Sequence, residues 1–169
     1  ETVSPLSSST ADNLLPPWMD VYTDDVPHYE YDPEKARRLL AEAGYPNGFT
    51  VTQLGRTSDG VTEEDQLEQS YLAEVGIKLK FELIDTAVNN ERRNAGDFEV
   101  AGRLLPAINP DMILFSYLAP ENIAPKGMNG SRYDNPELYE KLRRARATTD
   151  PDERKKSYAE VQRIAMTDL

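Results

Sequence analysis

The sequence predicts an α/β fold in which a mostly parallel sheet is covered by helices. Two observations carry this prediction. Segments with helical periodicity alternate along the chain with short segments of strand character, and most helical segments have recognisable start and stop residues. An alternation of helices and strands is typical of parallel strands joined by right-handed crossovers. The 169 residues are enough for a domain with its own core.

Four helices are predicted where a start signal precedes an apolar stripe of helical period. Three of them begin with an Asp or Asn, then a Pro and an acidic residue, at Asp32, Asn135 and Asp150. The Asp or Asn side chain can accept hydrogen bonds from free backbone N–H groups, and Pro at the first helical position has no N–H to lose. The fourth helix covers residues 62–75 and ends at Gly76.

Three strands are predicted between the helices. Residues 49–54 form a short run rich in β-branched side chains. Residues 77–83 and 98–104 alternate apolar and other side chains with a period of two, as a half-buried strand does. Residues 86–95 are predicted to form a polar helix that ends at Gly96. The expected order is helix, strand, helix, strand, helix, strand and then further helices.

The first 31 residues differ in composition from the rest of the chain. They contain a Ser-rich and a Pro-rich stretch without a sustained period, so we expect residues 1–31 to form an arm that packs on an α/β ligand-binding lobe of residues 32–169. The arm carries aromatic side chains that either pin it to the lobe or line a ligand cleft, namely Trp18, Tyr22, Tyr29 and Tyr31.

Composition excludes several classes of function. Lys and Arg number 19 against 30 Asp and Glu, and the net charge of -11 argues against nucleic acid as a partner, because phosphate binding needs clustered basic residues. With no Cys and one His, His28, a thiolate metal site, a Cys nucleophile and a Ser-His-Asp triad have almost no support. No phosphate-binding glycine motif occurs. We expect no cofactor, no metal site and no catalytic residues.

Two other classes of function remain as alternatives to ligand binding. A stand-alone α/β hydrolase would use a pair of carboxylates as its acid and base. The candidates for that pair lie near the predicted strand ends, although their spacing does not favour one, and they are Asp85, Asp97, Glu99 and Asp111. An interaction module would use the helix that begins at Pro151 as its docking face. The basic residues of that helix, Arg154, Lys155, Lys156 and Arg163, are more simply explained as solvent-exposed charge.

Ligands of open α/β sheets lie beyond the carboxyl ends of the strands. In this chain residues 55–58, 85–86 and 105–109 follow the predicted strands. Residues 103–133 combine four prolines and several polar side chains with the apolar run 112–115. This mixture suits either a wall that faces a ligand or a long structural connection.

The segment YDPEKARRLLAEAGYPNGF at residues 31–49 strongly resembles a segment of the family 5 extracellular solute-binding proteins, the peptide-binding and nickel-binding receptors of bacterial ABC importers. Shorter matches follow in the family's order at residues 72–79, 96–100, 109–111 and 131–138, and residues 149–166 match the family's penultimate helix.

The resemblance implies that this chain is the smaller, C-terminal lobe of a two-lobed periplasmic-binding-protein-like receptor of about three times this length, which closes on its ligand. The start at Glu1 fits a processed or excised piece. The implied partners are a peptide or related small solute, the remaining lobe and the ABC permease subunits. The implied location is extracytoplasmic, either periplasmic or lipid-anchored at the cell surface. One lobe offers half of the cleft, so we expect poor affinity from this chain alone.

The resemblance also implies which residues bind the ligand. In peptide-binding relatives an aspartate in the loop after the third strand pairs with the peptide's amino terminus. Residues 104–108 contain no acid here, and the nearest candidate is Asp111, whose alternative role is to cap the next helix. Arg103 would bind a carboxylate through its planar fork, or form an ordinary ion pair. The full set of predicted ligand-binding residues is Arg103, Asn109, Asp111, Asn129, Arg132, Tyr133 and Trp18, with turn formation as the alternative for Asn129 and Arg132.

Overall fold

The computed structural model describes residues 13–102 and 109–168, and the contacts within it divide the chain into two compact units. The described part of unit 1 is residues 30–102, and that of unit 2 is residues 13–29 together with 109–168. The sequence led us to expect an arm and a single lobe. The structure groups the arm residues 13–29 with the C-terminal helices and places the predicted strands in the other unit.

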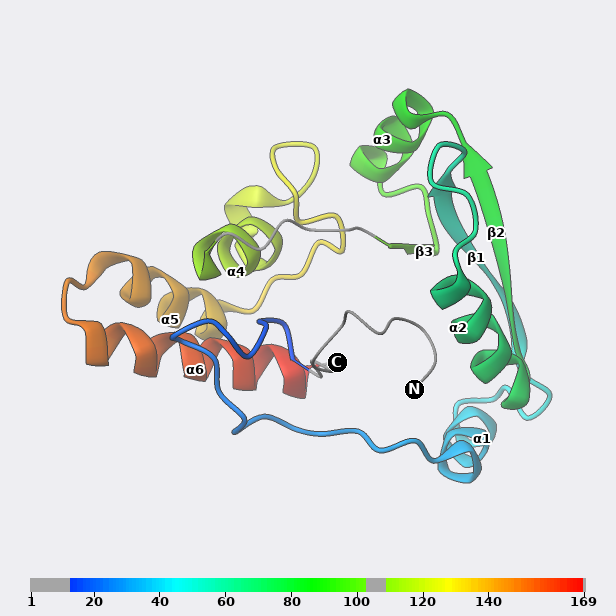
Figure 1. Ribbon diagram of the computed structural model, residues 1–169, viewed down its shortest axis with the longest axis horizontal. Helices are drawn as coiled ribbons and strands as arrows, with labels where there is room; N and C mark the ends of the chain where they lie inside the picture. Colours follow the sequence, from blue (N-terminus) through cyan, green and yellow to red (C-terminus); the bar gives the residue numbers. More distant parts are fainter. Residues whose placement is uncertain (1–12, 103–108, 169) are drawn as a thin grey trace. The chain divides into compact units, whose positions relative to one another are not determined.

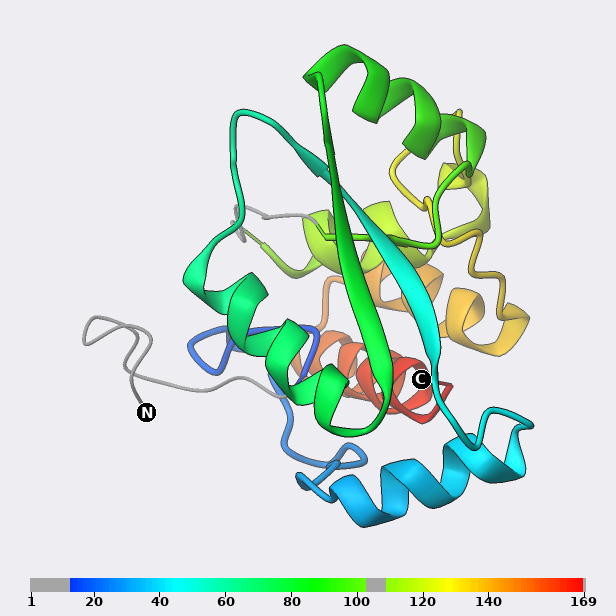
Figure 2. The same cartoon turned by 90° about the vertical axis from the view of Figure 1, so that its right-hand side faces the viewer.

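Within residues 30–102, unit 1 is built on a parallel sheet with the strand order β2–β1–β3 (Figure 1). β1 (Phe49–Arg56) pairs with β2 (Ile77–Ile84) along its whole length, as Figure 2 shows from the side. β3 (Val100–Ala101) pairs with the other edge of β1. The predicted parallel α/β arrangement is confirmed. The third strand is shorter than predicted over the described residues, and the last two residues predicted for it lie outside them.

The helices of unit 1 occur where the sequence predicts them. They are α1 (Pro33–Glu42), α2 (Glu63–Glu74) and α3 (Thr86–Ala95). α2 packs on β2 and α3 packs on β1, so the helices cover the sheet. At the start of α2 the Thr62 hydroxyl accepts a hydrogen bond from the Asp65 N–H, and the Asp65 carboxylate accepts one from the Thr62 N–H. This reciprocal pair satisfies two backbone donors that the helix itself leaves free.

Two glycines bring the turns before β1 and β2 into close contact. Gly48 has φ +70°, and a Cβ atom at this position would lie 1.9 Å from the carbonyl oxygen of Gly76. Position 48 requires glycine for two reasons. Its backbone lies in the left-handed region, and the neighbouring turn leaves no space for a side chain. The contact sets the start of both paired strands.

Unit 2 is a helical unit formed by α4 (Pro110–Leu118), the 3₁₀ turn η1 (Pro120–Asn122), α5 (Pro136–Ala147) and α6 (Pro151–Thr167) (Figure 1). α5 and α6 form a hairpin whose facing side chains make the core, with Leu138, Leu142 and Val161 fully buried. Both helices were predicted. The sequence analysis assigned no bounds to α4, because its apolar residues do not form the one-sided stripe that identifies a surface helix.

The arm residues are held to α6 by a buried amide. Gln162 is fully buried, and its Nε2 donates to the carbonyl oxygen of Val21 at 2.8 Å, while its Oε1 accepts a hydrogen bond from Asn13 Nδ2 at 2.9 Å. Leu15 and Val21 add apolar side chains to the core formed by α4, α5 and α6. Polar and apolar contacts together therefore seat residues 13–26 on the helices.

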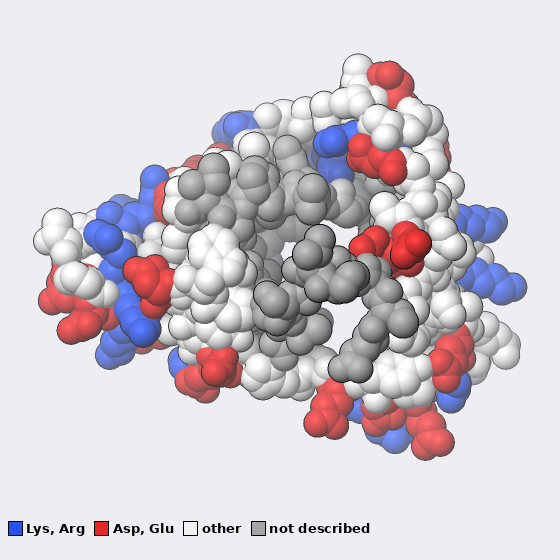
Figure 3. Space-filling model, viewed as in Figure 1, with Lys and Arg blue, Asp and Glu red and all other residues white. Residues whose placement is uncertain are grey.

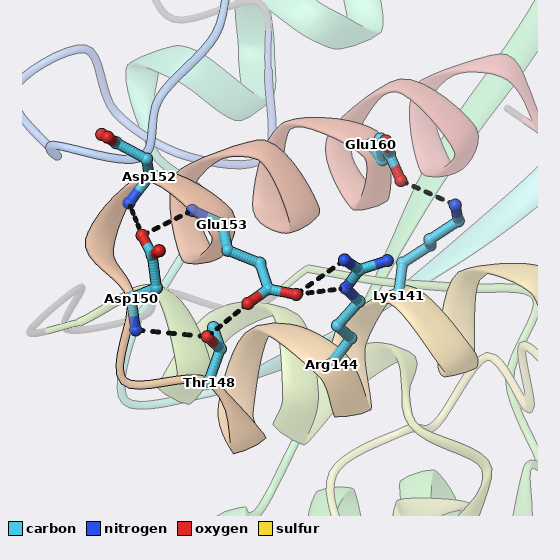
Figure 4. A network of polar contacts seen from close by, with 7 residues as sticks. All are labelled: Lys141, Arg144, Thr148, Asp150, Asp152, Glu153 and Glu160. Atoms are coloured by element: carbon cyan, nitrogen blue, oxygen red, sulfur yellow. Dashed lines mark hydrogen bonds and ion pairs between the residues drawn. The ribbon is translucent and has the colours of Figure 1, made fainter.

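A network of polar contacts joins the end of α5 to the start of α6 (Figure 4). Asp150 caps α6 by accepting hydrogen bonds from the N–H groups of Asp152 and Glu153. The Glu153 carboxylate accepts from the Thr148 hydroxyl at 2.7 Å and pairs with Arg144 at 2.6 Å, and these contacts lower the pKa of Glu153.

On the face shown in Figure 3, acidic and basic side chains lie next to one another over α5 and α6. None of the described helices has the length and apolar character that a membrane span requires.

The contact between the turns of unit 1 leads to a first prediction. Gly48→Ala lowers the free energy of unfolding by about 1–3 kcal/mol more than Gly60→Ala does, because the new methyl group collides with the backbone of Gly76. Gly60 is the matched control, since it also has φ +70° and a Cβ there meets nothing within 4 Å. Chemical denaturation of both variants measures the difference. Equal losses would show that the close approach of the two turns does not matter.

A second prediction concerns the buried amide of α6. Gln162→Ala lowers the stability of unit 2 by about 1–3 kcal/mol, because the Val21 carbonyl loses the Gln162 donor and the Asn13 amide keeps only its bond to the Thr23 carbonyl oxygen. Gln66→Ala, at an exposed position of α2, changes stability by less than about 0.5 kcal/mol. Amide hydrogen exchange of residues 13–26 provides a second measurement and is expected to accelerate in Gln162→Ala alone. Unchanged exchange there would contradict the proposed tie.

Candidate functional site

Unit 2 contains a pocket of about 340 Å³ at the point where α4 begins, α5 ends and α6 begins. We call it the α4 pocket. Two predicted ligand-binding residues, Asn109 and Asp111, line it. The lining is completed by the arm, by α4, by the end of α5 and by the start of α6, through Asp20, Val21, Pro110, Ala145, Arg146, Arg154 and Tyr158.

Asp111 and Arg146 form the charged wall of this pocket. The Arg146 Nε atom lies 3.1 Å from Asp111 Oδ1, and its guanidinium carbon lies 3.5 Å from the centre of the Phe115 ring. An ion pair and a cation–π contact thus hold the same guanidinium. The Asp111 carboxylate therefore already has a cationic partner within the protein.

Tyr158 completes the wall from α6. Its hydroxyl lies 3.4 Å from Asp111 Oδ1 and donates to it. Burial, followed by the nearby Asp111 charge, raises the pKa of Tyr158 to about 12. The phenol therefore stays protonated at neutral pH and remains a donor.

Asn109 caps α4, a role for which the sequence offered Asp111. The Asn109 Oδ1 atom accepts a hydrogen bond from the Met112 N–H at 2.7 Å. The residue that caps a helix precedes its first helical position, and Asp111 lies one residue after Pro110, inside the helix. The expected alternative of Asp111 as the cap is therefore wrong.

The predicted residues 129–133 form a turn that does not line the α4 pocket. Asn129 is fully buried. Its Nδ2 donates to the carbonyl oxygens of Ala119 and Tyr133, and its Oδ1 accepts from the Tyr133 N–H and the Ser131 hydroxyl. The turn-forming role offered as the alternative for Asn129 accounts for these contacts. Arg132 is exposed and adopts φ 58°, in the left-handed region.

Tyr133 and Trp18 lie elsewhere in unit 2. The Tyr133 hydroxyl donates to Asp168 Oδ2 at 2.5 Å, and burial together with this bond raises the pKa of Tyr133. Trp18 is 67% exposed and does not line the α4 pocket. Arg103 lies outside the described residues. The ligand-binding role of these residues stays a prediction.

Asp20 and Arg154 line the α4 pocket but were not predicted. The sequence held no signal for Asp20, which is one of many acidic residues in a loop. Arg154 belongs to a run of basic residues on α6 that the analysis assigned to the solvent-exposed face. Its Nη2 donates to the carbonyl oxygen of Thr148 at 2.8 Å, which holds the guanidinium near the start of the helix.

Unit 1 has its own pocket, of about 460 Å³, beside β1. It is lined by Glu82, Arg92, Asp97 and Glu99 among others. Arg92 pairs with Glu82 at 2.7 Å and with Asp97 at 2.9 Å, and Glu99 accepts a hydrogen bond from the backbone of Thr52 at 2.6 Å. The charged groups of this pocket thus bind one another or the sheet.

The carboxylates considered for a hydrolase all have structural partners. Asp97 pairs with Arg92, Glu99 bonds to β1, Asp85 caps α3 and Asp111 pairs with Arg146. Nothing in the described residues favours the hydrolase. Within those same residues, no three His, Cys, Asp or Glu side chains gather closely enough to hold a metal ion.

The chain is similar in sequence to a known protein family and to individual proteins. The family described as "Bacterial extracellular solute-binding proteins, family 5 Middle" matches residues 2–123. Heme-binding protein A of Haemophilus influenzae is 33% identical over 171 residues, which cover 97% of this chain and 31% of that protein. Glutathione-binding protein GsiB of Escherichia coli K12 is 31% identical over 165 residues, covering 93% and 32% of the two chains.

Solved structures agree with the sequence comparison. The ABC transporter-associated periplasmic binding protein DppA from Helicobacter pylori, in complex with the peptide STSA, superposes with a TM-score of 0.78 at 31% identity, over 92% of this chain and 31% of that one. HbpA2 from Haemophilus parasuis gives a TM-score of 0.80 at 30% identity, over 94% and 32%. The chain thus spans about a third of the length of these relatives. Since the family match covers well over half of its residues, the chain belongs to the bacterial extracellular solute-binding proteins of family 5.

Proposed function

We propose that this chain is part of a solute-binding protein of a bacterial ABC importer, and that it binds a peptide or a related small solute. Family membership is the observation that carries this proposal. The names and titles of relatives support it, because they describe binding of the peptide STSA, of the dipeptide Met-Leu, of heme and of glutathione. The DppA relative is described as associated with an ABC transporter.

In the proposed receptor this chain contributes one wall of a ligand cleft, and the rest of the protein contributes the other. The bound solute is delivered to the permease subunits from an extracytoplasmic compartment. The predicted ligand-binding residues supply the polar groups of this wall, and Asn109 and Asp111 belong to the α4 pocket. Closure of two walls over a ligand removes most of its surface from water, which is the main source of affinity in such clefts.

Binding without catalysis fits the chemistry of the described residues. The acidic side chains that a hydrolase would use are engaged by Arg92, by Arg146 or by backbone N–H groups. The relatives are named for the solutes that they bind. No specific observation favours the hydrolase or the interaction module.

An NMR titration of the 169-residue chain tests the proposal. Free peptides such as Met-Leu and STSA are expected to shift the backbone amides of Asn109, of Asp111 and of residues 129–133, with saturation at about millimolar concentration. The affinity is expected to be weak because this chain supplies one wall. A peptide of the same sequence with acetylated and amidated ends serves as the matched control and is expected to bind more weakly, since it lacks both terminal charges.

Two results would contradict the proposal. The absence of saturable shifts with peptides, glutathione, heme and sugars would show that the chain binds no solute of the proposed kind. Binding at submicromolar concentration would show that the chain does not need a second wall.

A further inference from the structure

We propose that Asn47 is a site of spontaneous deamidation in the folded chain, and that the isoaspartate formed there loosens the turn before β1. The chain contains two Asn-Gly pairs, Asn47–Gly48 and Asn129–Gly130. An asparagine followed by glycine is prone to this reaction, because glycine has no Cβ atom to obstruct the approach of its backbone nitrogen to the asparagine side chain. The reaction is independent of solute binding.

Deamidation needs water as its only other reactant. The backbone nitrogen of Gly48 gives its proton to a base in the solvent and attacks Cγ of Asn47, which closes a succinimide ring. The side-chain nitrogen of Asn47 leaves as ammonia. Water then opens the ring at either of its carbonyl carbons, and the backbone nitrogen regains a proton. The product is aspartate or isoaspartate, so a carboxylate replaces an amide and the chain gains a negative charge.

The attacking nitrogens are in similar states in the two pairs. The Gly48 N–H donates to the carbonyl oxygen of Tyr45 at 2.9 Å, and the Gly130 N–H donates to that of Met128 at 2.8 Å. Either hydrogen bond must open before the nitrogen can attack, and local fluctuations open such turns. The difference between the pairs therefore lies in their asparagine side chains.

The side chain of Asn47 is accessible, whereas that of Asn129 is held in place. Asn47 is exposed in the turn between α1 and β1, and no hydrogen bond joins its amide to another described residue. Asn129 is fully buried, and its Nδ2 donates to the carbonyl oxygens of Ala119 and Tyr133 at 3.2 and 2.8 Å. Turning Cγ of Asn129 toward the next nitrogen would break these bonds and leave buried carbonyl groups unpaired. The fold therefore protects Asn129 and leaves Asn47 reactive.

Isoaspartate at position 47 lengthens the main chain where the structure has no spare room. It routes the backbone through the former side chain and so inserts a methylene group before Gly48. A Cβ atom on Gly48 would lie 1.9 Å from the carbonyl oxygen of Gly76, and one on Gly76 would lie 3.5 Å from the carbonyl oxygen of Asn47. A longer backbone cannot keep this close approach, so the paired starts of β1 and β2 are weakened. Ordinary aspartate leaves the backbone unchanged.

Ageing of the folded 169-residue chain at mildly alkaline pH tests the proposal. Peptide mapping by mass spectrometry measures the replacement of NH2 by OH at each asparagine, and an isoaspartyl methyltransferase assay detects isoaspartate. Asn47 is expected to deamidate at least about tenfold faster than Asn129 in the folded chain. In denaturant, where neither side chain is protected, the two rates are expected to agree within about threefold.

A second measurement follows the effect on the fold. Chromatography isolates the isoaspartyl form of the aged chain, and Asn47→Asp is the matched control because it has the same charge on an unmodified backbone. The isoaspartyl form is expected to unfold at a temperature about 2–4 °C lower than Asn47→Asp, with faster amide exchange at the starts of β1 and β2. Asn47→Gln is expected to abolish the isoaspartate and leave Asn129 unaffected.

The proposal is overturned by any of three results. Asn47 that is stable in the folded chain, or that reacts no faster than Asn129, would show that an exposed side chain does not select the site. A rate difference that persists in denaturant would assign the selection to local sequence instead of the fold. An isoaspartyl form that unfolds and exchanges as Asn47→Asp does would show that the turn tolerates the longer backbone.

Discussion

The hydrogen bonds of Gln162 are the interaction on which the arrangement of unit 2 depends. Its buried amide joins Asn13 and Val21 to α6, across a large separation in sequence. Within α6 the Gln162 Nε2 donates only to the Tyr158 carbonyl oxygen, at 3.0 Å. Its bond to Val21 and the bond that its Oε1 accepts from Asn13 both require the arm to lie along the helix, and a buried amide that lost them would be costly. The arm then adds Leu15 and Val21 to the core and supplies one side of the α4 pocket.

The α4 pocket exists because the ends of helices meet there. Asp150 caps α6, Asn109 caps α4, and the contacts of Glu153 with Arg144 and Thr148 hold the α5–α6 connection. Because of these local contacts, Arg146 lies at the end of α5 and Arg154 lies near the start of α6. Arg146 pairs with Asp111 and lies over the Phe115 ring, whereas Arg154 donates to the carbonyl oxygen of Thr148. Two arginines on neighbouring helix ends therefore have different roles.

Unit 1 obtains its order in a different way. Neither α1 nor α2 contains a buried residue, and the buried apolar side chains among the described residues of unit 1 are Leu54 of β1 and Leu79 of β2. The turns before these two strands approach closely at Gly48 and Gly76. The resemblance noted in the sequence runs through these turns, at residues 31–49 and 72–79. Two of the recognisable motifs thus include glycines whose backbone geometry leaves little choice of residue.

Helix caps, strand alternation and the order of motifs were sufficient to predict the α/β fold, five helices, the parallel strands and the family, because these features depend on neighbours in sequence. α4 lacked such a pattern, since its apolar residues do not lie on one face. The pairing of Asp111 with Arg146, and the shared pocket that Asp20 and Arg154 line, could not be predicted. These residues are far apart in the chain, and any of 30 acidic and 19 basic side chains could have been partners. Only the packing of the arm and the helix ends selects among them, because ion pairs and pockets depend on distance in space.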